Sequence, residues 1–450
     1  MFSEDNRVIR TVTFLDSLIV IAVLAASLIQ VSIAASQLLL GIGIGLMLVS
    51  RRRLEFPRIW LPLAVFFSLT LISVLLSPDP WGGHTQIRKF YVFLLLPLMY
   101  SVFSRTFPAV QYVMIGWAIA ATASGVLGLA QFYSKYHHAN VTGEDFYTSY
   151  VAARITGFES HWMTFGALQL SVVLFLLAHL FFSGKRWPAW SYAVGITTMG
   201  AAIILGWTRS IWIASVPAIL YLVWFWRPKL IWLAPLAIAA AFIAAPGDTH
   251  DRIASFISPH GATDSNQHRL VTFRTGLAMI KRHPWFGLGP EQIGKQFAAY
   301  TPADIPRPLP AGFYGHLHNI YLQYAAERGI PALIAVLWLI GLLVLDCARH
   351  LRQLRPGRSQ ERFVLQAAIA FTIAILIEGF FEFNLGDSEV LMMFVTVAGL
   401  AYAAIRQPVP TPIASEIRQS ADPGAPGPGR LANLRPLLRQ LPAVRSPLGH

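Results

Sequence analysis

The sequence is poor in the residues that soluble and secreted proteins rely on. It contains a single cysteine, Cys347, so no internal disulfide can form. Charged residues make up only 13% of the chain, about half of the ~25% that is typical of soluble domains. Hydrophobic residues, in contrast, make up 55%. These proportions exclude a soluble enzyme, a disulfide scaffold and a disordered chain.

Acidic residues are also scarce, with 22 against 35 basic ones, which leaves a net charge of +13. Such an excess can indicate nucleic-acid binding, but the basic residues form no single patch interleaved with aromatic residues. They occur instead in short clusters between apolar runs, as in the cytoplasmic loops of membrane proteins. We therefore expect membrane lipids around the chain and no nucleic-acid partner.

Long apolar runs dominate the rest of the sequence. A membrane span needs roughly 20 mostly apolar residues. Twelve runs approach this length, at residues 12–30, 35–50, 59–76, 90–104, 109–133, 162–182, 189–206, 210–226, 230–245, 330–347, 363–382 and 388–405. The runs are continuously apolar rather than alternating, which favours helices over the strands of a barrel. The sequence thus predicts an all-α polytopic membrane protein with about twelve transmembrane helices.

The basic clusters predict the orientation of these helices. If the first residue is cytoplasmic and the runs alternate, 22 of the 35 basic residues face the cytoplasm. Short cytoplasmic loops carry such an excess in membrane proteins. We therefore expect both termini in the cytoplasm. We expect no cleavable signal peptide, because the first apolar run continues directly into a second.

Four regions follow from this topology. Residues 1–245 carry the first nine helices, with a long outer loop at 134–161. Residues 246–329 form a large polar outer loop, and residues 330–405 carry the last three helices. The tail, 406–450, contains nine prolines and few large apolar residues, so we expect it to be disordered. Long outer loops are commonly functional, and the candidate site residues lie in or beside them.

Four arginines at the predicted outer boundary are candidates for binding an anion. Arg154 follows the first long loop, and Arg209 lies in the tight turn between the seventh and eighth runs. Arg269 and Arg274 lie on an amphipathic stretch, residues 269–281. The planar donor fork of arginine suits a diphosphate better than lysine does. The alternative for each arginine is that its side chain extends to lipid headgroups.

A predicted helix spans residues 318–328. His316 lies just before it, and His318 lies at its start. A helix N-terminus disfavours an imidazolium, so a histidine there stays neutral and can accept a proton from a sugar hydroxyl. A capping or interfacial histidine is the alternative. A metal site is less favoured, because no cysteine or carboxylate stands at ligand spacing nearby in the sequence.

Four carboxylates, Glu378, Glu382, Asp387 and Glu389, lie at the outer turn between the last two apolar runs. Carboxylates at membrane depth are costly and are usually paired or functional. Glu382 can pair with one of the outer arginines. A solvated turn is the alternative for this cluster.

Together these segments resemble the bacterial O-antigen ligase and polymerase superfamily. The resemblance covers about residues 150–400 and rests on the segments RITGFESHWMTFG, WTRSIW, HRLVTFRTGLAMIKRHPWFGLG, HLHNIYLQYAAERGI and EFNLGDSE. Members of this superfamily move glycans from undecaprenyl diphosphate on the periplasmic side of the inner membrane. The resemblance implies an inverting, metal-independent glycosyltransferase of the C-type (GT-C) architecture, with one large periplasmic loop and no cofactor.

The resemblance also implies roles for the candidate residues. His318 matches the essential histidine of the family, its proposed general base, with Asn319 directly after it and His316 as an addition to the usual pattern. Arg209 and Arg269 match arginines that hold the diphosphate. We group Arg154 and Arg274 with these two. Asp387 stands where the family carries an acidic residue near the site, and we count Glu382 with it as a supporting residue.

The acceptor stays open at this point. A ligase transfers the glycan to a sugar of lipid A-core, whereas a polymerase transfers it to a second lipid-linked repeat. One long outer loop carries most of the candidate site, which favours a ligase, because polymerases often have two comparable loops. A transporter of lipid-linked sugars is less favoured, because the charges gather at the outer edge rather than at mid-membrane.

Overall fold

The computed structural model describes residues 2–244, 247–255 and 266–408 of the chain. Every regular element in these ranges is a helix. Each of the twelve predicted apolar runs coincides with a helix: α1 (Phe2–Ser27), α2 (Ile33–Val49), α3 (Trp60–Leu76), α5 (Leu95–Phe103), α6 (Val110–Thr142), α8 (Trp162–Phe182), α9 (Ala189–Leu205), α10 (Arg209–Trp226), α11 (Ala234–Ala244), α16 (Ile330–Gln353), α17 (Gln360–Glu378) and α18 (Ser388–Ile405). Most of the predicted disordered tail, from residue 409 on, lies outside the described residues.

The lengths of these helices confirm a polytopic α-helical membrane protein. Within the described residues, six helices are long and apolar enough to cross a membrane, namely α6, α8, α10, α16, α17 and α18. Four more apolar helices, α1 from Leu15 on, α2, α3 and α9, are slightly shorter. The helices α5 and α11 have only 9 and 11 residues. A total of twelve crossings therefore stays a prediction.

Short polar and glycine residues set the ends of several helices. Ser32 and Ser359 precede α2 and α17, and each hydroxyl accepts a hydrogen bond from a backbone N–H three residues on. This satisfies one of the free donors of a helix N-terminus. Gly143 adopts a φ of 73° directly after α6 and ends that helix, as glycine commonly does.

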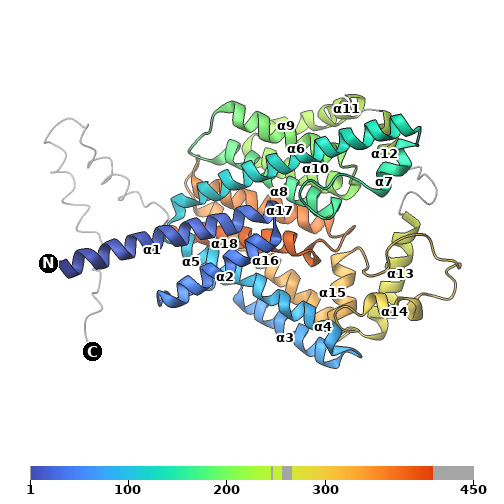
Figure 1. Ribbon diagram of the computed structural model, residues 1–450, viewed down its shortest axis with the longest axis horizontal. Helices are drawn as coiled ribbons and strands as arrows, with labels where there is room; N and C mark the ends of the chain where they lie inside the picture. The colour runs from blue at the N-terminus through green and yellow to red at the C-terminus, as the bar shows by residue number, and fades with distance from the viewer. Residues whose placement is uncertain (1, 245–246, 256–265, 409–450) are drawn as a thin grey trace. The chain divides into compact units, whose positions relative to one another are not determined.

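The centre of the bundle is formed by α8, α17 and α18 (Figure 1). The helices α8 and α18 are buried along most of their length. Because α8 is apolar on every side, it is suited to such an enclosed position. α17 packs against α8, α10 and α18, and α18 packs against α5. The site residues at the ends of these three helices therefore rest on a well-packed support.

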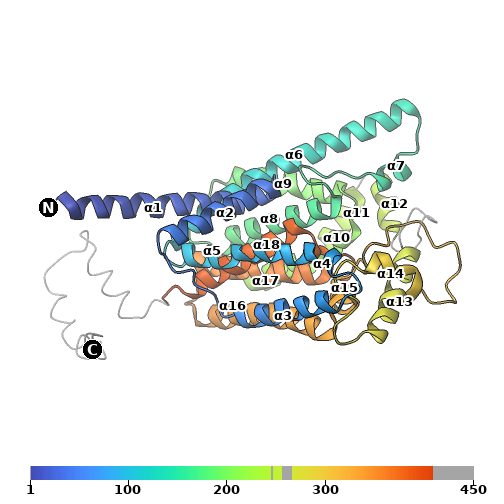
Figure 2. The same ribbon diagram turned by 60° about the horizontal axis from the view of Figure 1, so that its bottom comes forward.

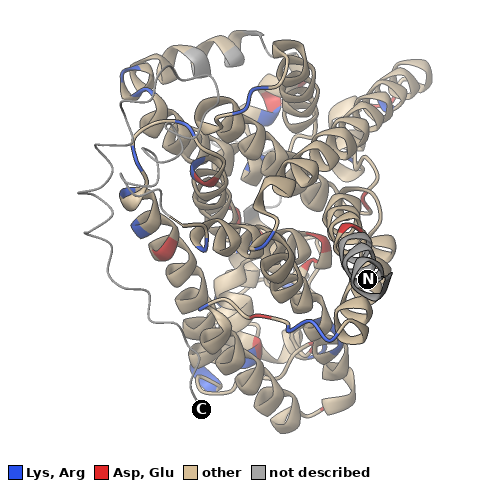
Figure 3. Cartoon of the chain, turned by 90° about the vertical axis from the view of Figure 1, so that its left-hand side faces the viewer, with Lys and Arg blue, Asp and Glu red and all other residues tan. Residues whose placement is uncertain are grey.

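One end of the bundle is basic, and this basic end is viewed in Figure 3, where Lys and Arg lie in the loops that join the helices. Glu55, in the loop after α2, forms an ion pair with Arg105 at 2.7 Å and another with Arg406. These contacts hold the loops near the start of α6 and the end of α18 together. The basic end is the one that the charge distribution predicts to be cytoplasmic.

The opposite end carries the polar segment between α11 and α16. Its described part contains α12 (Gly247–Ala254), α13 (Asn266–Arg282), α14 (Ile293–Tyr300) and α15 (Ile320–Arg328). The predicted amphipathic and histidine-led helices correspond to α13 and α15. The short helices α4 (Pro80–Arg88) and α7 (Phe146–Ala152) also occur outside the apolar runs. Both views place α7, α12, α13 and α14 at this same end (Figures 1 and 2).

Five short 3₁₀ turns complete the described elements. They are η1 (Leu28–Gln30), η2 (Lys89–Leu94), η3 (Phe107–Ala109), η4 (Pro228–Leu233) and η6 (Asn384–Gly386). The last of them lies in the outer turn between α17 and α18, which carries the predicted carboxylates.

Candidate functional site

The start of α15 is fixed against the turn that follows α17. Asn319 caps α15, because its side-chain oxygen accepts a hydrogen bond from a backbone N–H three residues on. Its amide nitrogen donates to the Phe380 carbonyl at 3.0 Å, and the Ile320 N–H donates to the Gly379 carbonyl at 2.8 Å. His318 directly precedes this cap with a φ of 49°. Such a backbone conformation is rare outside glycine and persists where its surroundings hold it.

This arrangement brings the two histidines to Glu382. The Nδ1 atom of His318 lies 3.3 Å from Oε2 of Glu382, and the Nε2 atom of His316 lies 3.8 Å from Oε1. The His318 backbone N–H donates to Nδ1 of His316 at 3.2 Å. Glu382 is only 6% exposed. The carboxylate therefore pairs with histidines, whereas the sequence suggested an arginine as its partner.

The second ring nitrogen of His318 also has a partner. Its Nε2 atom lies 3.1 Å from the carbonyl of Phe313, and Nε2 of His268 lies 2.9 Å from the same oxygen. A carbonyl oxygen can only accept, so both Nε2 atoms act as donors in this arrangement. His318 is thus held between a carboxylate on one side and a carbonyl on the other.

The buried surroundings shift the protonation of this cluster. Burial lowers the pKa of His316 to about 4, and the nearby His318 adds to this effect. Burial also lowers the pKa of His161 and of His268. Burial raises the pKa of Glu382, but the hydrogen bond and charge of His318 outweigh it, so the net shift is downward. Near pH 7 the site therefore combines an ionised Glu382 with neutral His161, His268 and His316.

Four arginines gather on the same side of the molecule. Arg209 begins α10 and is 6% exposed, and Arg252 on α12 is 3% exposed. The pKa of Arg154 is lowered first by burial and then by the charge of Arg252, with smaller contributions from Arg209 and Arg269. Burial likewise lowers the pKa of Arg269, the charge of Glu382 partly offsets this, and the charge of Arg252 adds to the lowering. The four guanidinium groups therefore lie close enough to repel one another, and we call them the arginine cluster.

Two members of the arginine cluster contact aromatic rings rather than carboxylates. The guanidinium of Arg154 lies 4.9 Å from the ring centre of Trp162, and that of Arg269 lies 5.7 Å from the ring centre of Phe381. Neither forms an ion pair with a carboxylate in the described part of the chain. A half-buried cation without such a counter-ion is costly, and an anionic ligand would remove that cost.

Arg274 lies apart from the arginine cluster. Its side chain is 42% exposed and forms an ion pair with Asp304 at 2.7 Å. Arg274 is not among the charges that shift the pKa of Arg154 or of Arg269. The structure thus brings three of the four predicted diphosphate arginines together and places the fourth on the surface of α13.

Asp387 lies at the start of α18 and faces α8. It accepts a hydrogen bond from the hydroxyl of Thr164 at 2.7 Å. Burial raises the pKa of Asp387 to about 6, and the charge of Glu382 contributes to the shift. Asp387 therefore belongs to the electrostatic neighbourhood of the histidines without contacting them directly.

A cavity of 310 Å³ lies beside His318. Arg269, His318 and Asn319 contribute polar groups to its lining, and most of its other lining residues are apolar, among them Phe273 and Phe380. Such a lining suits a ligand with an apolar chain and an anionic head.

Three of the site residues also meet the requirements for holding a metal ion. His316, His318 and Glu382 offer ligand atoms that all lie within 4.8 Å of one another. Two histidines and a carboxylate are common zinc ligands. The sequence gave no sign of this grouping, because Glu382 lies 64 residues after His318. The direct contact between His318 and Glu382 equally makes an acid–base pair.

Sequence reasoning missed two charged or titratable neighbours of the site. Arg252 donates to the carbonyl of Trp207, which lies 45 residues earlier in the chain. His268 meets His318 with ring centres 5.1 Å apart. Arg252 stands in no local motif, and His268, although it begins the segment HRLVTFRTGLAMIKRHPWFGLG, reaches His318 only through the packing of α13 against the start of α15. The one available signal was their position in the large polar segment.

Comparison with known proteins bears on this site. No curated protein matches the chain. Residues 194–337 match the model of a protein family described as O-antigen ligase. This span contains Arg209, Arg252, Arg269 and His318. This match supports the resemblance of the chain to the O-antigen ligase and polymerase family that the sequence predicted.

Proposed function

We propose that the protein is an O-antigen ligase. It transfers a glycan from undecaprenyl diphosphate to a sugar hydroxyl of lipid A-core, at the periplasmic face of the bacterial inner membrane. One observation carries this proposal: the arginine cluster and the histidine–carboxylate pair lie at the same end of an apolar helical bundle. The arginine cluster suits the binding of a lipid diphosphate, and the histidine–carboxylate pair suits the activation of a hydroxyl.

The arginine cluster holds the diphosphate in this proposal. Arg154, Arg209 and Arg269 bind it, and Arg252 supports them by its charge. Negative charge develops on the leaving diphosphate as the glycosidic bond breaks. Preorganised donors in a partly buried site stabilise such charge more than they stabilise the ground state. The apolar part of the cavity beside His318 accommodates the first isoprene units of the lipid.

His318 acts as the general base. The acceptor hydroxyl oxygen attacks the anomeric carbon from the face opposite the diphosphate, which inverts the configuration. A new C–O bond forms, the bond to the diphosphate breaks with its electron pair, and the hydroxyl proton moves to Nε2 of His318. Glu382 orients the ring through Nδ1 and stabilises the imidazolium that forms, as carboxylates do for histidine bases elsewhere. His316 and Asn319 position the base.

This chemistry requires Nε2 of His318 to leave the Phe313 carbonyl and to release its proton to solvent, so that the ring keeps one proton, on Nδ1, which it donates to Glu382. The contact between them is 3.1 Å in the present structure. The acceptor hydroxyl then takes the place of the carbonyl and donates to the unprotonated Nε2 of a neutral His318. Hydrogen bonds of catalytic groups are commonly rearranged in this way when substrate binds.

The proposed topology follows the charge distribution. Twelve spans of a GT-C architecture, with both termini cytoplasmic, place the large loop in the periplasm. Reporter fusions at Arg53, Arg186 and Arg406 should read cytoplasmic, and a fusion at Ala262 should read periplasmic. A cytoplasmic reading at Ala262 would contradict the whole mechanism, because the site would face the wrong compartment.

The function is tested with purified protein in detergent. We expect release of undecaprenyl diphosphate only when a lipid-linked glycan and lipid A-core are both supplied. Release with the lipid-linked glycan alone, together with longer lipid-linked chains, would instead identify a polymerase, the alternative that uses a second repeat as acceptor. No release with either acceptor would contradict both and favour a transporter of lipid-linked sugars.

The metal-independent mechanism has its own test. His316, His318 and Glu382 are assigned to proton transfer rather than to metal binding. Dialysis of the purified protein against EDTA should therefore leave the transfer rate within about twofold of the untreated rate. Loss of transfer that zinc restores would reassign these three residues as metal ligands.

A further inference from the structure

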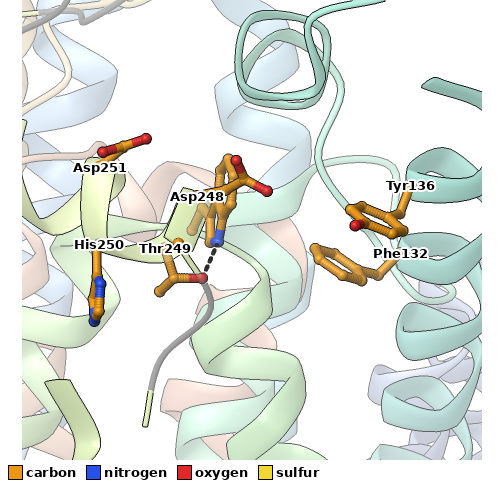
Figure 4. Close-up of a pocket in the computed structure, with 8 residues that line it drawn as sticks. Phe132, Tyr136, Asp248, Thr249, His250 and Asp251 are labelled. Carbon is orange, nitrogen blue, oxygen red and sulfur yellow. Dashed lines mark hydrogen bonds between the residues drawn. The ribbon is translucent and has the colours of Figure 1, made fainter. Parts of the chain in front are cut away.

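A second pocket, here called the α6–α12 pocket, lies outside the site described above. Its volume is 590 Å³, within the range of small-molecule sites, about 300–1,000 Å³. Phe132 and Tyr136 of α6 line one side, and Asp248 and Asp251 of α12 line the other (Figure 4). Trp207, in the turn before α10, also lines it.

The length of α6 places this pocket beyond the apolar layer. α6 has 33 residues, which at 1.5 Å per residue gives a length of about 50 Å. The hydrocarbon core of a bilayer is only about 30 Å thick. Phe132 and Tyr136 lie in the last third of α6, at the end of the bundle that carries α7 and α12 (Figure 2). The pocket is therefore open to the aqueous side on which the site lies.

The aromatic side of the pocket is rigid. The rings of Phe132 and Tyr136 lie one helical turn apart and nearly parallel, with 6° between their planes. Phe132 packs edge-on against Phe146 and Tyr150, with ring centres 5.6 and 5.2 Å away. Tyr150 in turn packs edge-on against the fully buried Trp207. The cluster holds Phe132, while Tyr136 remains 44% exposed and available to a ligand.

The opposite side of the pocket offers hydrogen-bond acceptors. The carboxylates of Asp248 and Asp251 accept no hydrogen bond from any described residue. Figure 4 shows Asp248 on the side of α12 that faces the two rings. Asp145 adds a third negative charge that acts on Asp248. The negative charge of these carboxylates repels phosphate groups. An acyl chain has no hydrogen-bond donors, so it would leave the carboxylates of the pocket without partners.

Aromatic rings opposite carboxylates match the two surfaces of a sugar. The C–H face of a pyranose packs on an aromatic ring, and its hydroxyls donate to carboxylate oxygens, which are acceptors only. We propose that the α6–α12 pocket is a glycan-binding subsite, in which Tyr136 and Phe132 stack on a sugar ring and Asp248 and Asp251 accept hydrogen bonds from its hydroxyls. This inference rests on the proposed function, because it takes the ligand to be a substrate glycan.

The pocket adjoins the arginine cluster through Trp207. The indole N–H of Trp207 donates to the Thr249 hydroxyl at 3.1 Å, next to Asp248. The carbonyl of Trp207 accepts a hydrogen bond from Nε of Arg252 at 3.1 Å. Trp207 therefore connects the pocket to Arg252, so a glycan bound in the pocket would lie close to the arginine cluster. This proximity suits either the donor glycan or the acceptor glycan.

Binding of lipid-free glycans tests the proposal. The probes are the core oligosaccharide and the O-polysaccharide, each freed of its lipid by mild acid and titrated calorimetrically into the full-length protein in nanodiscs. Tyr136→Ala and Asp248→Asn should each weaken binding of one probe at least fivefold. Weakened core binding identifies an acceptor subsite, and weakened O-polysaccharide binding identifies a donor subsite. Unchanged binding of both probes in both variants would overturn the proposal.

A matched control is Tyr133→Ala. Tyr133 lies on the same helix and is 70% exposed, but it does not line the pocket. The Kd of this control for both probes should stay within twofold of that of the original protein. If the control lost as much affinity as the pocket variants, the proposal would be overturned. The melting temperature of each variant is measured to confirm folding.

Kinetics separate this proposal from the proposed function. Pocket variants should raise KM at least fivefold for one glycan and leave kcat within about twofold, because they remove binding rather than chemistry. Normal transfer with unchanged KM would overturn the subsite and leave the ligase function standing. The original protein could instead bind a glycan but transfer none. If the pocket variants weakened that binding, the result would support the subsite and contradict the ligase function.

Discussion

Arginines lie at both ends of the helical bundle, but their charges are balanced in different ways. At the basic end, Glu55 lies between Arg105 and Arg406 and forms an ion pair with each. At the site end, Arg154 and Arg269 are half-buried and form no ion pair with a carboxylate in the described residues. The charges at the basic end are therefore balanced by a direct ion pair, whereas those of Arg154 and Arg269 are not.

The difference also separates two physical roles. Exposed ion pairs contribute little to stability, about 0–1 kcal/mol, so the basic end serves mainly as a charged surface. Removing a cation from water without a counter-ion costs several kcal/mol of folding free energy. Proteins retain such unfavourable features mainly at functional sites. The contrast therefore supports the proposal that Arg154 and Arg269 bind an anion, without reference to any motif.

The largest expected effect separates chemistry from binding at the site end. His318→Ala removes the proposed base but leaves the arginine cluster intact. General base catalysis contributes roughly 10²–10⁴ in rate, so kcat should fall by at least about 10² while the Kd for the lipid-linked donor stays within threefold. His316→Ala should cost less than about tenfold, the equivalent of about 1.4 kcal/mol.

Transfer by both histidine variants is measured at matched membrane levels, alongside donor binding. An inactive His316→Ala with an active His318→Ala would move the base to His316. Activity in both variants would make a carboxylate the base, with Asp387 the next candidate.

The second prediction compares the two ends directly. Arg154→Lys and Arg269→Lys keep the charge but lose the planar fork. A hydrogen bond to a charged group contributes about 1.5–3 kcal/mol, so kcat/KM should fall by about 10- to 150-fold in each. Arg105→Lys at the basic end should stay within about threefold, because its ion pair with Glu55 is exposed.

These three variants are assayed with the same donor at low and at high salt. Near-normal activity of Arg154→Lys and Arg269→Lys would assign both arginines to lipid headgroups. A comparable fall in kcat/KM for Arg105→Lys would contradict this comparison. It would show that activity does not depend on whether an arginine is paired with a carboxylate.

A third, smaller effect concerns stability. The folded-state pKa of Asp387 is raised to about 6 by burial, so its proton is held more tightly in the folded than in the unfolded state. Its contribution is favourable at low pH and is lost as the pH rises from about 4 to about 6. Asp387→Asn should therefore raise the melting temperature by a few degrees at pH 7.5, and the gain should vanish at pH 4.

Thermal unfolding of both proteins, measured across this pH range in one detergent, checks the sign. A variant that is less stable than the original protein at pH 7.5 would show that the hydrogen bond from Thr164 outweighs burial.

The smallest expected effect lies at the basic end. Deletion of residues 412–450 removes five of the arginines assigned to the cytoplasmic side. Because the proposed topology places this proline-rich segment on the side of the membrane opposite the site, transfer should stay within about twofold at equal membrane levels. A large loss of transfer would reveal a partner or a folding role of this segment.

Much of the helical framework was predictable from the sequence, because burial in lipid imposes continuous apolar runs. Local patterns also predicted the helices that became α13 and α15, since amphipathic spacing and the residues around Asn319 are local signals. The pairing of Glu382 with His318 was not predictable, because it depends on how α15 packs against the turn after α17. Arg252 was missed for the same reason, since its contacts come from a turn 45 residues earlier.

The carbonyl of Phe313 has a consequence for the resting protein. It occupies Nε2 of His318, at 3.1 Å, before any acceptor arrives. A water molecule that enters the site with only the donor bound therefore meets a base that is already engaged. An activated lipid diphosphate is exposed to hydrolysis wherever a free base can deprotonate water. In the proposed mechanism, the hydrogen bond of one loop carbonyl thus limits hydrolysis of the lipid-linked donor until the acceptor hydroxyl takes its place at Nε2.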